Sequence, residues 1–158
     1  MPEKRALIDD MTLNDLTAVL EIERLCFSNP WPYSIFLADL ESENVTTLVV
    51  RSGKKVIGFA ICMIISDELQ LMNIAVHPDF RRKKVGHMLL ERLFYIGERQ
   101  GCKVMYLEVR KSNSGAISFY NRYGFSALYE RKGYYRNPPE DALVMVLNLN
   151  ERLKSGVV

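Results

Sequence analysis

The chain has 158 residues, a length that suits one domain with a single sizeable core. Hydrophobic residues make up 48% and charged residues 25%, as in ordinary globular proteins, and the net charge of +2 is smaller than nucleic-acid-binding domains usually carry. No apolar run approaches the roughly 20 residues that span a bilayer, and residues 1–10 lack the apolar segment of a secretory signal, so we expect a cytoplasmic protein that binds neither DNA nor membranes.

The first third of the chain alternates short apolar strands with amphipathic helices. We predict a strand over Arg5–Ile8, a helix capped by Thr12 or Asn14 that ends near Cys26, a helix over Ile35–Leu40 capped by Ser34, and strands over Val45–Val50 and Val56–Ile65. Two prolines lie between the two helices, at positions 30 and 32. They enforce an irregular loop that presents Trp31 and Tyr33.

A strand, a turn, a basic loop and a helix then follow in direct succession. The apolar run Leu71–Val76 predicts a buried strand that ends at His77–Asp79. From Val85 onward apolar residues recur at spacings of three and four, which predicts an amphipathic helix. The basic run Arg81–Lys84 and Gly86 therefore lie at a helix N-terminus, where unpaired N–H groups and the helix dipole favour anions. This position indicates a phosphate or pyrophosphate site, although a solvated surface run or a nucleic-acid-binding patch has the same composition.

The remaining elements complete a mixed sheet with helices on its faces. We predict a strand over Lys103–Val109, a helix over Ala116–Tyr120 capped by Ser112-Asn113, a strand over Phe125–Tyr129, a loop over Gly133–Glu140 and a last strand over Ala142–Leu149. The order of elements indicates an α/β (α+β) fold with about seven strands and about four helices. Residues 1–150 are expected to form one domain and residues 151–158 a frayed tail.

Three polar side chains near the end of this sheet are candidates for chemistry. Glu108 ends an otherwise apolar strand, where a partly desolvated carboxylate can act as a general base; the alternative is an ordinary glutamate paired with Arg110. Tyr120 is either a core tyrosine or a proton donor whose hydroxyl points into a cleft. Asn113 either caps its helix or binds the amide groups of a ligand.

The sequence contains no pattern for a metal site or for covalent catalysis. Cys26, Cys62 and Cys102 are widely spaced and form no CxxC pair, so we expect small buried hydrophobes rather than a disulfide or a zinc site. His77 is expected in a turn, and His87 at an exposed position in the first turn of its helix. No Ser-His-Asp or Cys-His spacing is present, and the absence of GxxxxGK excludes a nucleotide-hydrolysing P-loop.

Together these stretches resemble the GNAT superfamily of acetyl-CoA-dependent N-acetyltransferases. RRKKVG matches the superfamily loop pattern Q/R-x-x-G-x-G/A at Arg81 and Gly86 and has Lys84 where the pattern has glycine. A Cβ there restricts the backbone φ and the approach of a ligand, while the ammonium adds charge. The blocks NIAVHPDF, LEVRKSN, AISFYNRYGF and YYRNPPEDALVM, with the Pro30-Trp31 pair, resemble the RimI-type subgroup of N-terminal acetyltransferases of ribosomal proteins.

This resemblance implies a mostly antiparallel GNAT sheet, acetyl-CoA as cosubstrate and no metal. It implies that the backbone of Ile74, Ala75 and Val76 pairs with the pantetheine arm and that Asn113 contacts the cosubstrate near its thioester. It implies Glu108 as general base and Tyr120 as general acid. The pyrophosphate would be held by Arg81, Arg82, Lys83, Lys84, Val85, Gly86 and His87. The groove for a peptide would be shaped by Trp31, Tyr33, Tyr134, Tyr135 and Glu140.

The acceptor implied by the resemblance is a protein N-terminus, with the N-terminal alanine of a small-subunit ribosomal protein as the leading substrate. A second interpretation keeps the fold but acetylates lysine side chains or a small-molecule amine. A third is a non-catalytic module that binds CoA or nucleic acid through RRKK. We expect a monomer.

Overall fold

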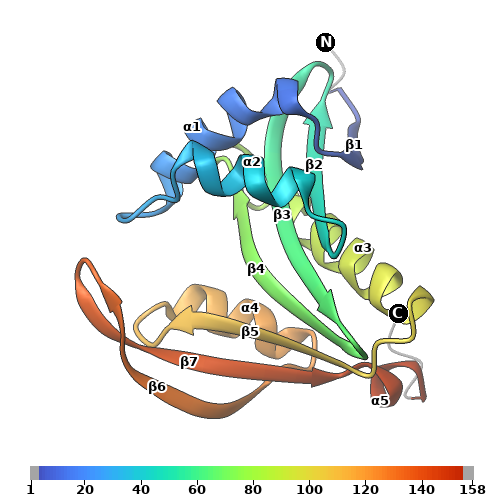
Figure 1. Ribbon diagram of the computed structural model, residues 1–158, viewed down its shortest axis with the longest axis vertical. Helices are drawn as coiled ribbons and strands as arrows, with labels where there is room; N and C mark the ends of the chain where they lie inside the picture. Colours follow the sequence, from blue (N-terminus) through green and yellow to red (C-terminus); the bar gives the residue numbers. More distant parts are fainter. Residues whose placement is uncertain (1–3, 155–158) are drawn as a thin grey trace. The chain divides into compact units, whose positions relative to one another are not determined.

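The computed structural model describes residues 4–154, which form seven strands and five α-helices (Figure 1). The strands are β1 (Ala6–Asp10), β2 (Val45–Ser52), β3 (Lys55–Ile65), β4 (Glu68–Val76), β5 (Val104–Arg110), β6 (Ser126–Arg136) and β7 (Pro139–Asn148). The helices are α1 (Leu16–Cys26), α2 (Tyr33–Glu41), α3 (Val85–Arg99), α4 (Ser114–Arg122) and α5 (Leu149–Lys154). Single 3-10 turns, η1 (Leu13–Asp15) and η2 (Pro78–Phe80), precede α1 and the basic loop.

The strands follow the order β1-β2-β3-β4-β5-β7-β6 in a seven-stranded sheet within the described residues. The pairs β1–β2, β2–β3, β5–β7 and β6–β7 are antiparallel, whereas β4 and β5 are parallel. By its contacts the chain divides into two compact units. Within the described residues, the first comprises residues 4–63 and 72–95, and the second residues 64–71 and 96–154.

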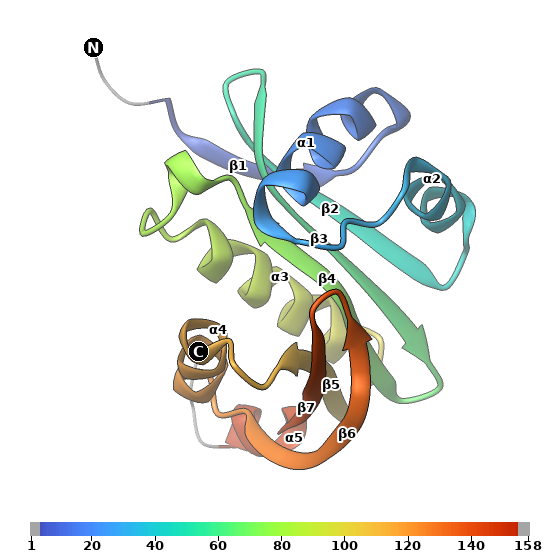
Figure 2. The ribbon, with the colours of Figure 1, turned by 90° about the vertical axis from the view of Figure 1, so that its left-hand side faces the viewer.

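In the first unit, helices cover both faces of the strands (Figures 1 and 2). Helices α1 and α2 pack on one face and bury a core made of Met11, Leu16, Val19, Leu20, Ile22, Phe36, Val49, Val56, Phe59, Ile61 and Ala75. Phe36 and Phe59 meet edge to face, with ring centroids 5.7 Å apart. The first turns of α3 pack on the other face, so the strands that carry the basic loop are buried on both sides.

Gly58 sets how closely α3 approaches the sheet. A Cβ at this position would lie 2.8 Å from Val85 Cγ1 and 3.2 Å from the Ala75 carbonyl oxygen. Because a side chain would force these atoms apart, glycine allows the first turn of α3 to pack directly on β3. The basic loop is positioned by this contact.

In the second unit, α4 lies along the strands β5 and β7 (Figure 1). Tyr120 is buried beside Phe125, and the two rings lie 5.6 Å apart. Gly124, at φ +96°, follows the end of α4. A Cβ added at this position would lie 3.2 Å from Leu147 Cδ1. Along β5, alternate residues Met105, Leu107 and Val109 are buried, which leaves Glu108 on the opposite face of the strand.

Most predicted elements are confirmed with small shifts of their ends, including the start of α3 at Val85 and the Asn113 cap of α4. The predicted Ser34 cap is wrong: α2 begins at Tyr33, after Pro32, whose fixed φ suits the residue before a helix. The predicted loop over Gly133–Glu140 is also wrong. Strand β6 continues to Arg136 and β7 begins at Pro139, because prolines in the turn and at the first strand position cost no ladder hydrogen bond.

The C-terminal part differs from the expected frayed tail, because Glu151–Lys154 belong to α5. Residues 155–158 of that expected tail lie outside the described residues. Among residues 4–154, no helix combines the length and apolar character needed to cross a membrane.

Candidate active site

The basic loop of the first unit adopts an unusual backbone at the start of α3. Arg82 and Lys84 have φ angles of +61° and +64°, although neither is glycine. Alternation of left-handed and ordinary residues turns successive N–H groups toward one side and forms an anion-binding concavity. The Met88 N–H donates to the Lys84 carbonyl at 3.0 Å, so the helix ladder begins there. The exposed side chains of Arg81–Lys84 surround this helix N-terminus.

The end of β4, which leads into this loop, is held by contacts within the first unit. The ladder with β5 runs from Glu68–Val104 to Leu71–Leu107, and Ile74, Ala75 and Val76 lie beyond its end. The Cys26 thiol donates to the Val76 carbonyl at 3.3 Å and accepts from Arg81 Nη2 at 3.4 Å.

Both histidines lie where the sequence predicts. His77 is in the turn after β4, where its Nδ1 accepts the Asp79 N–H at 3.1 Å. His87 is exposed in the first turn of α3. The predicted burial of the cysteines is confirmed for Cys62 and Cys102, whereas Cys26 is half-buried. No disulfide joins them within residues 4–154, and that part of the chain holds no group of three or more His, Cys, Asp or Glu side chains arranged for a metal ion.

The loop between α1 and α2 carries Trp31 and Tyr33. Trp31 is half-buried and packs on Phe36, with ring centroids 5.7 Å apart. Its backbone N–H donates to Glu23 Oε2 at 3.3 Å. Tyr33 is exposed at the first residue of α2. The structure therefore fixes the backbone at Trp31 and leaves Tyr33 toward solvent.

In the second unit, Glu108 is held by the β6 strand. Its Oε1 accepts from Arg131 Nη1 at 2.6 Å, and its side chain is 30% exposed. The Tyr134 hydroxyl hydrogen-bonds to Glu108, which raises the pKa of Tyr134, and the Arg131 guanidinium lies 4.5 Å from the Tyr134 ring centroid. The alternative of a salt-bridged Glu108 is confirmed, but the partner is Arg131 and not Arg110, because the pairing of the strands brings Arg131 to Glu108.

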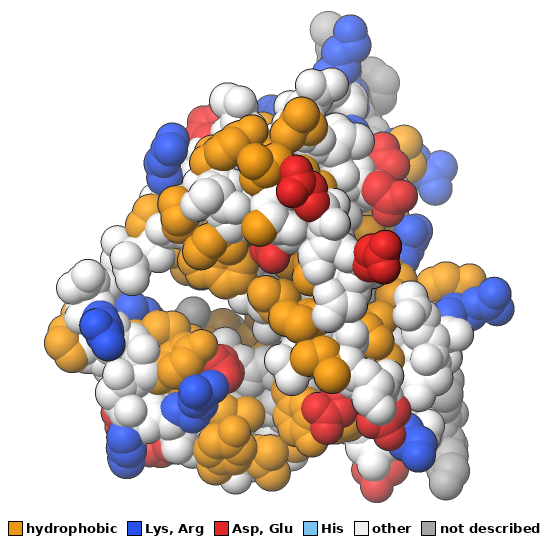
Figure 3. Space-filling model, in the orientation of Figure 1, with side chains coloured by type: hydrophobic (Ala, Val, Ile, Leu, Met, Phe, Trp, Pro, Cys, Tyr) orange, Lys and Arg blue, Asp and Glu red, His pale blue; other side chains and the backbone are white. Residues whose placement is uncertain are grey.

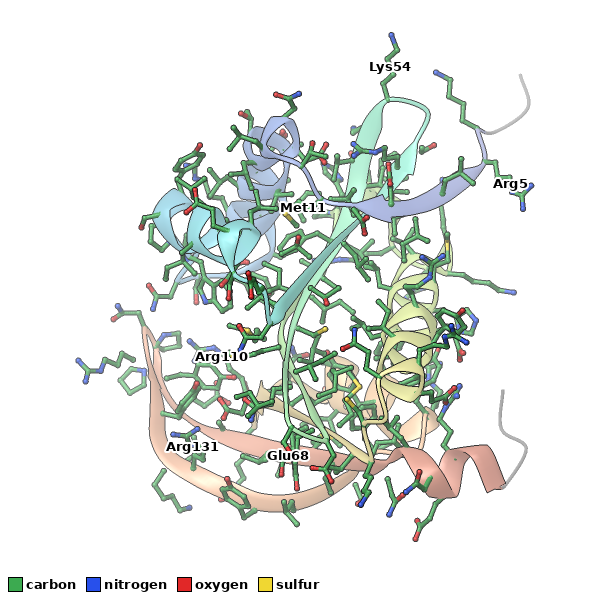
Figure 4. The ribbon with its side chains drawn as sticks, turned by 45° about the vertical axis from the view of Figure 1, so that its right-hand side comes forward. Arg5, Met11, Lys54, Glu68, Arg110 and Arg131 are labelled. Atoms are coloured by element: carbon green, nitrogen blue, oxygen red, sulfur yellow. The ribbon has the colours of Figure 1, made fainter. Side chains whose placement is uncertain are left out.

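Arg110 of β5, labelled in Figure 4, forms a second Arg–Glu pair, with Glu140 of β7. Its Nη1 lies 3.4 Å from Glu140 Oε1 and donates to the Pro138 carbonyl at 2.9 Å. Its guanidinium covers the Tyr135 ring at 4.3 Å from the centroid. Glu140 also accepts the Ser112 N–H at 2.6 Å. The Ser112 side chain, followed by this N–H and by Arg110, holds the pKa of Glu140 below its usual range.

Arginines of β5 and β6 therefore lie against aromatic rings of β6. Figure 3 shows blue and orange side chains next to one another at lower left. Tyr134 and Tyr135 contact each other edge to face, with centroids 5.0 Å apart. Burial raises the pKa of Tyr135 to about 12, with smaller contributions from Glu108 and Tyr134. Each ring is thus covered by an arginine, Tyr134 by Arg131 of the same strand and Tyr135 by Arg110 of β5.

Tyr120 is only 6% exposed, and burial, with a smaller contribution from Tyr135, raises the pKa of its hydroxyl well above the ordinary value. The hydroxyl therefore stays protonated across the physiological range and can donate a proton. Asn113 caps α4, where its Oδ1 accepts the Ala116 N–H at 3.1 Å. The second unit thus contains the Glu108 carboxylate, the protonated Tyr120 phenol and the edge-to-face pair Tyr134 and Tyr135.

The sequence analysis missed two residues of these networks, Arg131 and Glu23. Arg131 reaches Glu108 across the sheet, and no sequence spacing predicts that register. Glu23 had a usable signal, because it is four residues from Val19 and three from Cys26 and so lies on the apolar face of α1.

Comparison with known proteins shows the relationship of this chain. Residues 16–125 match the model of the acetyltransferase (GNAT) family. The chain belongs to the GNAT family. This acetyltransferase is 36% identical over 145 residues to the ribosomal protein bS18-alanine N-acetyltransferase of Salmonella typhimurium, covering 90% of this chain and 97% of the relative.

Solved structures agree with this membership. The crystal structure of the Escherichia coli ribosomal-protein-S18-alanine N-acetyltransferase superposes with a TM-score of 0.85 at 34% identity, covering 92% of this chain and 94% of that one. Arabidopsis thaliana NAA60 in complex with acetyl-CoA shares the fold, with a TM-score of 0.82 at 17% identity over 92% of this chain and 99% of that one. The fold is the GNAT fold, and the chain is an N-acetyltransferase with RimI-type relatives.

Proposed function

We propose that this acetyltransferase transfers an acetyl group from acetyl-CoA to the N-terminal amine of a protein. The N-terminal alanine of a small-subunit ribosomal protein is the leading substrate. The observation that carries the proposal is the similarity to ribosomal protein bS18-alanine N-acetyltransferases over nearly the whole length of both chains. The paired networks of the second unit provide groups that suit the reaction.

Acetyl-CoA binding is assigned to the basic loop and the end of β4 in the first unit and to Asn113 in the second. Its pyrophosphate suits the concavity of Arg82 and Lys84, where backbone N–H groups and four cationic side chains gather at the start of α3. The backbone of Ile74, Ala75 and Val76, beyond the end of the β4–β5 ladder, can pair with the pantetheine arm as an added strand would. The Asn113 amide, whose oxygen is used by the helix cap, retains two N–H donors for the amide oxygens of this arm.

Proton transfer is assigned to Glu108 and Tyr120. An α-amine has a reference pKa of about 7.7–8.0, so much of it is protonated near neutral pH and must lose that proton before attack. Glu108 accepts the proton, directly or through a water. The amine nitrogen then bonds to the thioester carbonyl carbon, the carbon–sulfur bond breaks, and the departing thiolate takes a proton from Tyr120. No acyl-enzyme forms, and binding both substrates together supplies proximity.

Peptide binding is assigned to aromatic side chains that are described in each unit separately. Trp31 and Tyr33 contribute from the first unit, and Tyr134 and Tyr135 from the second. Glu140 acts by holding Arg110 against the Tyr135 ring. Aromatic side chains that are fixed by cations or by packing bind an extended chain end with little loss of side-chain entropy. We further propose that residues 1–150 work as one acetyltransferase domain in a cytoplasmic monomer.

The test is steady-state turnover of acetyl-CoA with a short peptide that begins with alanine. Wild type is expected to acetylate the free N-terminus, and Glu108→Gln and Tyr120→Phe to lose turnover by about ten-fold or more, as expected for lost acid–base catalysis. Glu130→Gln is the matched control, because Glu130 lies next to Arg131 on β6 but pairs with Lys111 and Lys132 and belongs to none of the networks assigned to the reaction. It should retain turnover close to wild type.

The same assay separates the other interpretations. An Nα-blocked peptide that contains lysine should not react. Activity on that peptide, or only on small amines, would contradict the N-terminal assignment and leave the fold unaffected. Tight CoA binding without turnover of any amine would instead favour a binding module.

A further inference from the structure

Glu23 is a buried carboxylate that the proposed reaction does not use. It lies on the apolar face of α1 and is 1% exposed. A buried charge is unfavourable unless hydrogen bonds compensate it, and replacing a buried charged group by an apolar one of similar size is often neutral or stabilising. A carboxylate at this position therefore calls for a role other than stability of the core.

The two oxygens of Glu23 join three segments of the first unit. Asn73 Nδ2 donates to Oε1 at 2.7 Å and to Oε2 at 3.1 Å, and the Trp31 N–H donates to Oε2 at 3.3 Å. Asn73 is itself 9% exposed and directly precedes Ile74 on β4. One carboxylate thus connects α1, the strand assigned to the pantetheine arm and the loop assigned to the peptide.

The sequence around Trp31 makes this contact hard to replace. Pro30 and Pro32 have no N–H group, so Trp31 is the only backbone donor of the Pro-Trp-Pro segment. Its hydrogen bond to Glu23 is therefore the one main-chain donation that can fix this segment. Packing of the Trp31 ring on Phe36 fixes the side chain, and the Glu23 bond fixes the backbone.

A second contact ties the same end of α1 to β4, through the Cys26 thiol and the Val76 carbonyl. The last turn of α1 is thus attached to β4 on both sides of Ile74 and Ala75, at Asn73 and at Val76. The Pro-Trp-Pro segment is in turn anchored to this fixed helix end.

We propose that Glu23 is a positioning residue for the acceptor peptide, which holds the Trp31 loop against Asn73 of β4. The inference rests on the proposed function, because it takes the Trp31 loop as part of the peptide groove. Glu23 touches neither substrate in this role. Loss of its hydrogen bonds should therefore weaken peptide binding more than it affects the chemical step.

The first test exchanges the polar groups of the pair. Glu23→Gln replaces one of the two acceptor oxygens by an NH2 group, which then faces the donors of Asn73 and Trp31. Asn73→Asp places two carboxylates face to face. Each single variant therefore disrupts the match between donors and acceptors. The double variant Glu23→Gln/Asn73→Asp restores it, because the Gln amide can donate to the Asp and its oxygen can accept from Trp31. Net charge is also the same as in wild type. The single variants should raise the peptide KM by about ten-fold, the effect of losing a hydrogen bond to a charged group, with kcat less affected.

The second readout reports the loop itself, because Trp31 is the only tryptophan of the chain. The fluorescence emission of the Glu23→Gln variant should shift toward longer wavelength as Trp31 becomes more exposed, and the double variant should recover the wild-type emission. Asp15→Asn is the matched control. Asp15 is also a buried carboxylate, but it pairs with Arg51, so its variant should keep the wild-type emission and peptide KM.

The outcomes distinguish this inference from the proposed function. If wild type does not acetylate the alanine peptide, the proposed function fails. If wild type is active and Glu23→Gln changes kcat while the peptide KM and the emission stay the same, the positioning role is overturned. Should Glu23→Gln not fold, the double variant decides: recovery of peptide KM supports the inference, and a folded double variant with a ten-fold higher KM contradicts it.

Discussion

At the scale of single residues, Lys84 explains why the GNAT loop pattern has glycine at this position. Its φ of +64° lies in the left-handed region, which costs a residue with a Cβ about 1 kcal/mol. Glycine adopts this conformation without that cost. The chain accepts the cost and places an ammonium at the start of α3, where it adds to the field on a bound pyrophosphate.

Two substitutions at Lys84 should separate the effect of its left-handed backbone conformation from the effect of its charge. Lys84→Gly and Lys84→Ala each remove one cation, so both should change the acetyl-CoA KM by a few-fold at low salt, an effect that screening by added salt diminishes. Only glycine also relieves the backbone. Lys84→Gly should therefore unfold at a higher urea concentration than Lys84→Ala, with a difference of about 1 kcal/mol in the free energy of unfolding. Turnover should be nearly unchanged in both; a large loss would place Lys84 in the chemistry.

Residue patterns predicted part of the candidate site and not the rest. Glu108 and Tyr120 were predicted as candidates because each is a polar group within an apolar stretch. In the structure Glu108 is partly exposed and Tyr120 is buried. Arg131 could not be found, because it meets Glu108 only through the register of β6 against β7 and of β7 against β5. Long-range pairing of this kind depends on the whole sheet rather than on local spacing.

At the scale of elements, helices were predicted better than the C-terminal hairpin. The apolar stripes of α1 and α3 and the Asn113 cap of α4 carry strong local signals. Strand β6 carries a weak one, because nearly all its residues are exposed and Gly133, at φ +61°, interrupts it. The two prolines that suggested a loop instead occupy the turn and the first residue of β7.

The packing of α3 on Gly58 gives a prediction at this scale. Gly58→Ala introduces a Cβ 2.8 Å from Val85 Cγ1, so the first turn of α3 must move. The free energy of unfolding should fall by about 1–3 kcal/mol, the usual effect of overpacking. The acetyl-CoA KM should rise, since the same turn carries the anion site.

Gly115→Ala is the control for Gly58→Ala. Gly115 lies in α4, and the nearest atom to an added Cβ, Asn113 Oδ1, is 4.0 Å away. Alanine favours a helix by about 0.5–1 kcal/mol over glycine, so this variant should be at least as stable as wild type with an unchanged acetyl-CoA KM. Equal behaviour of the two variants in urea unfolding and kinetics would contradict the role given to Gly58.

At the scale of the whole molecule, one ion pair should shape the response of stability to acid. Asp15 is buried, and Arg51 Nη1 and Nη2 lie 2.5 Å and 2.8 Å from its oxygens. The hydrogen bonds from Arg51 hold the pKa of Asp15 below its ordinary value. The stability that the Asp15 carboxylate contributes is therefore fully present at a pH above its ordinary pKa. It is lost as the pH falls through the lower pKa that Asp15 has in the folded state.

Arg51→Met should lower the free energy of unfolding at pH 7 by about 2 kcal/mol, less than for a fully buried pair because the Arg51 side chain is 24% exposed. The difference in the free energy of unfolding between variant and wild type should narrow below about pH 4, where Asp15 becomes protonated in the unfolded state while it is still charged in the folded state. Urea unfolding at a series of pH values measures this. A gap that is constant with pH would show that the pair contributes packing alone.

The two outer strands of the sheet have a consequence for behaviour at high concentration. Strand β1 is only five residues long and ends in Asp9-Asp10, while β6 carries Arg131 and Lys132 and shows irregular register against β7. Short, charged or irregular edges are poor templates for strand addition by another molecule. The two outer strands can thus remain unpaired on one side without promoting aggregation.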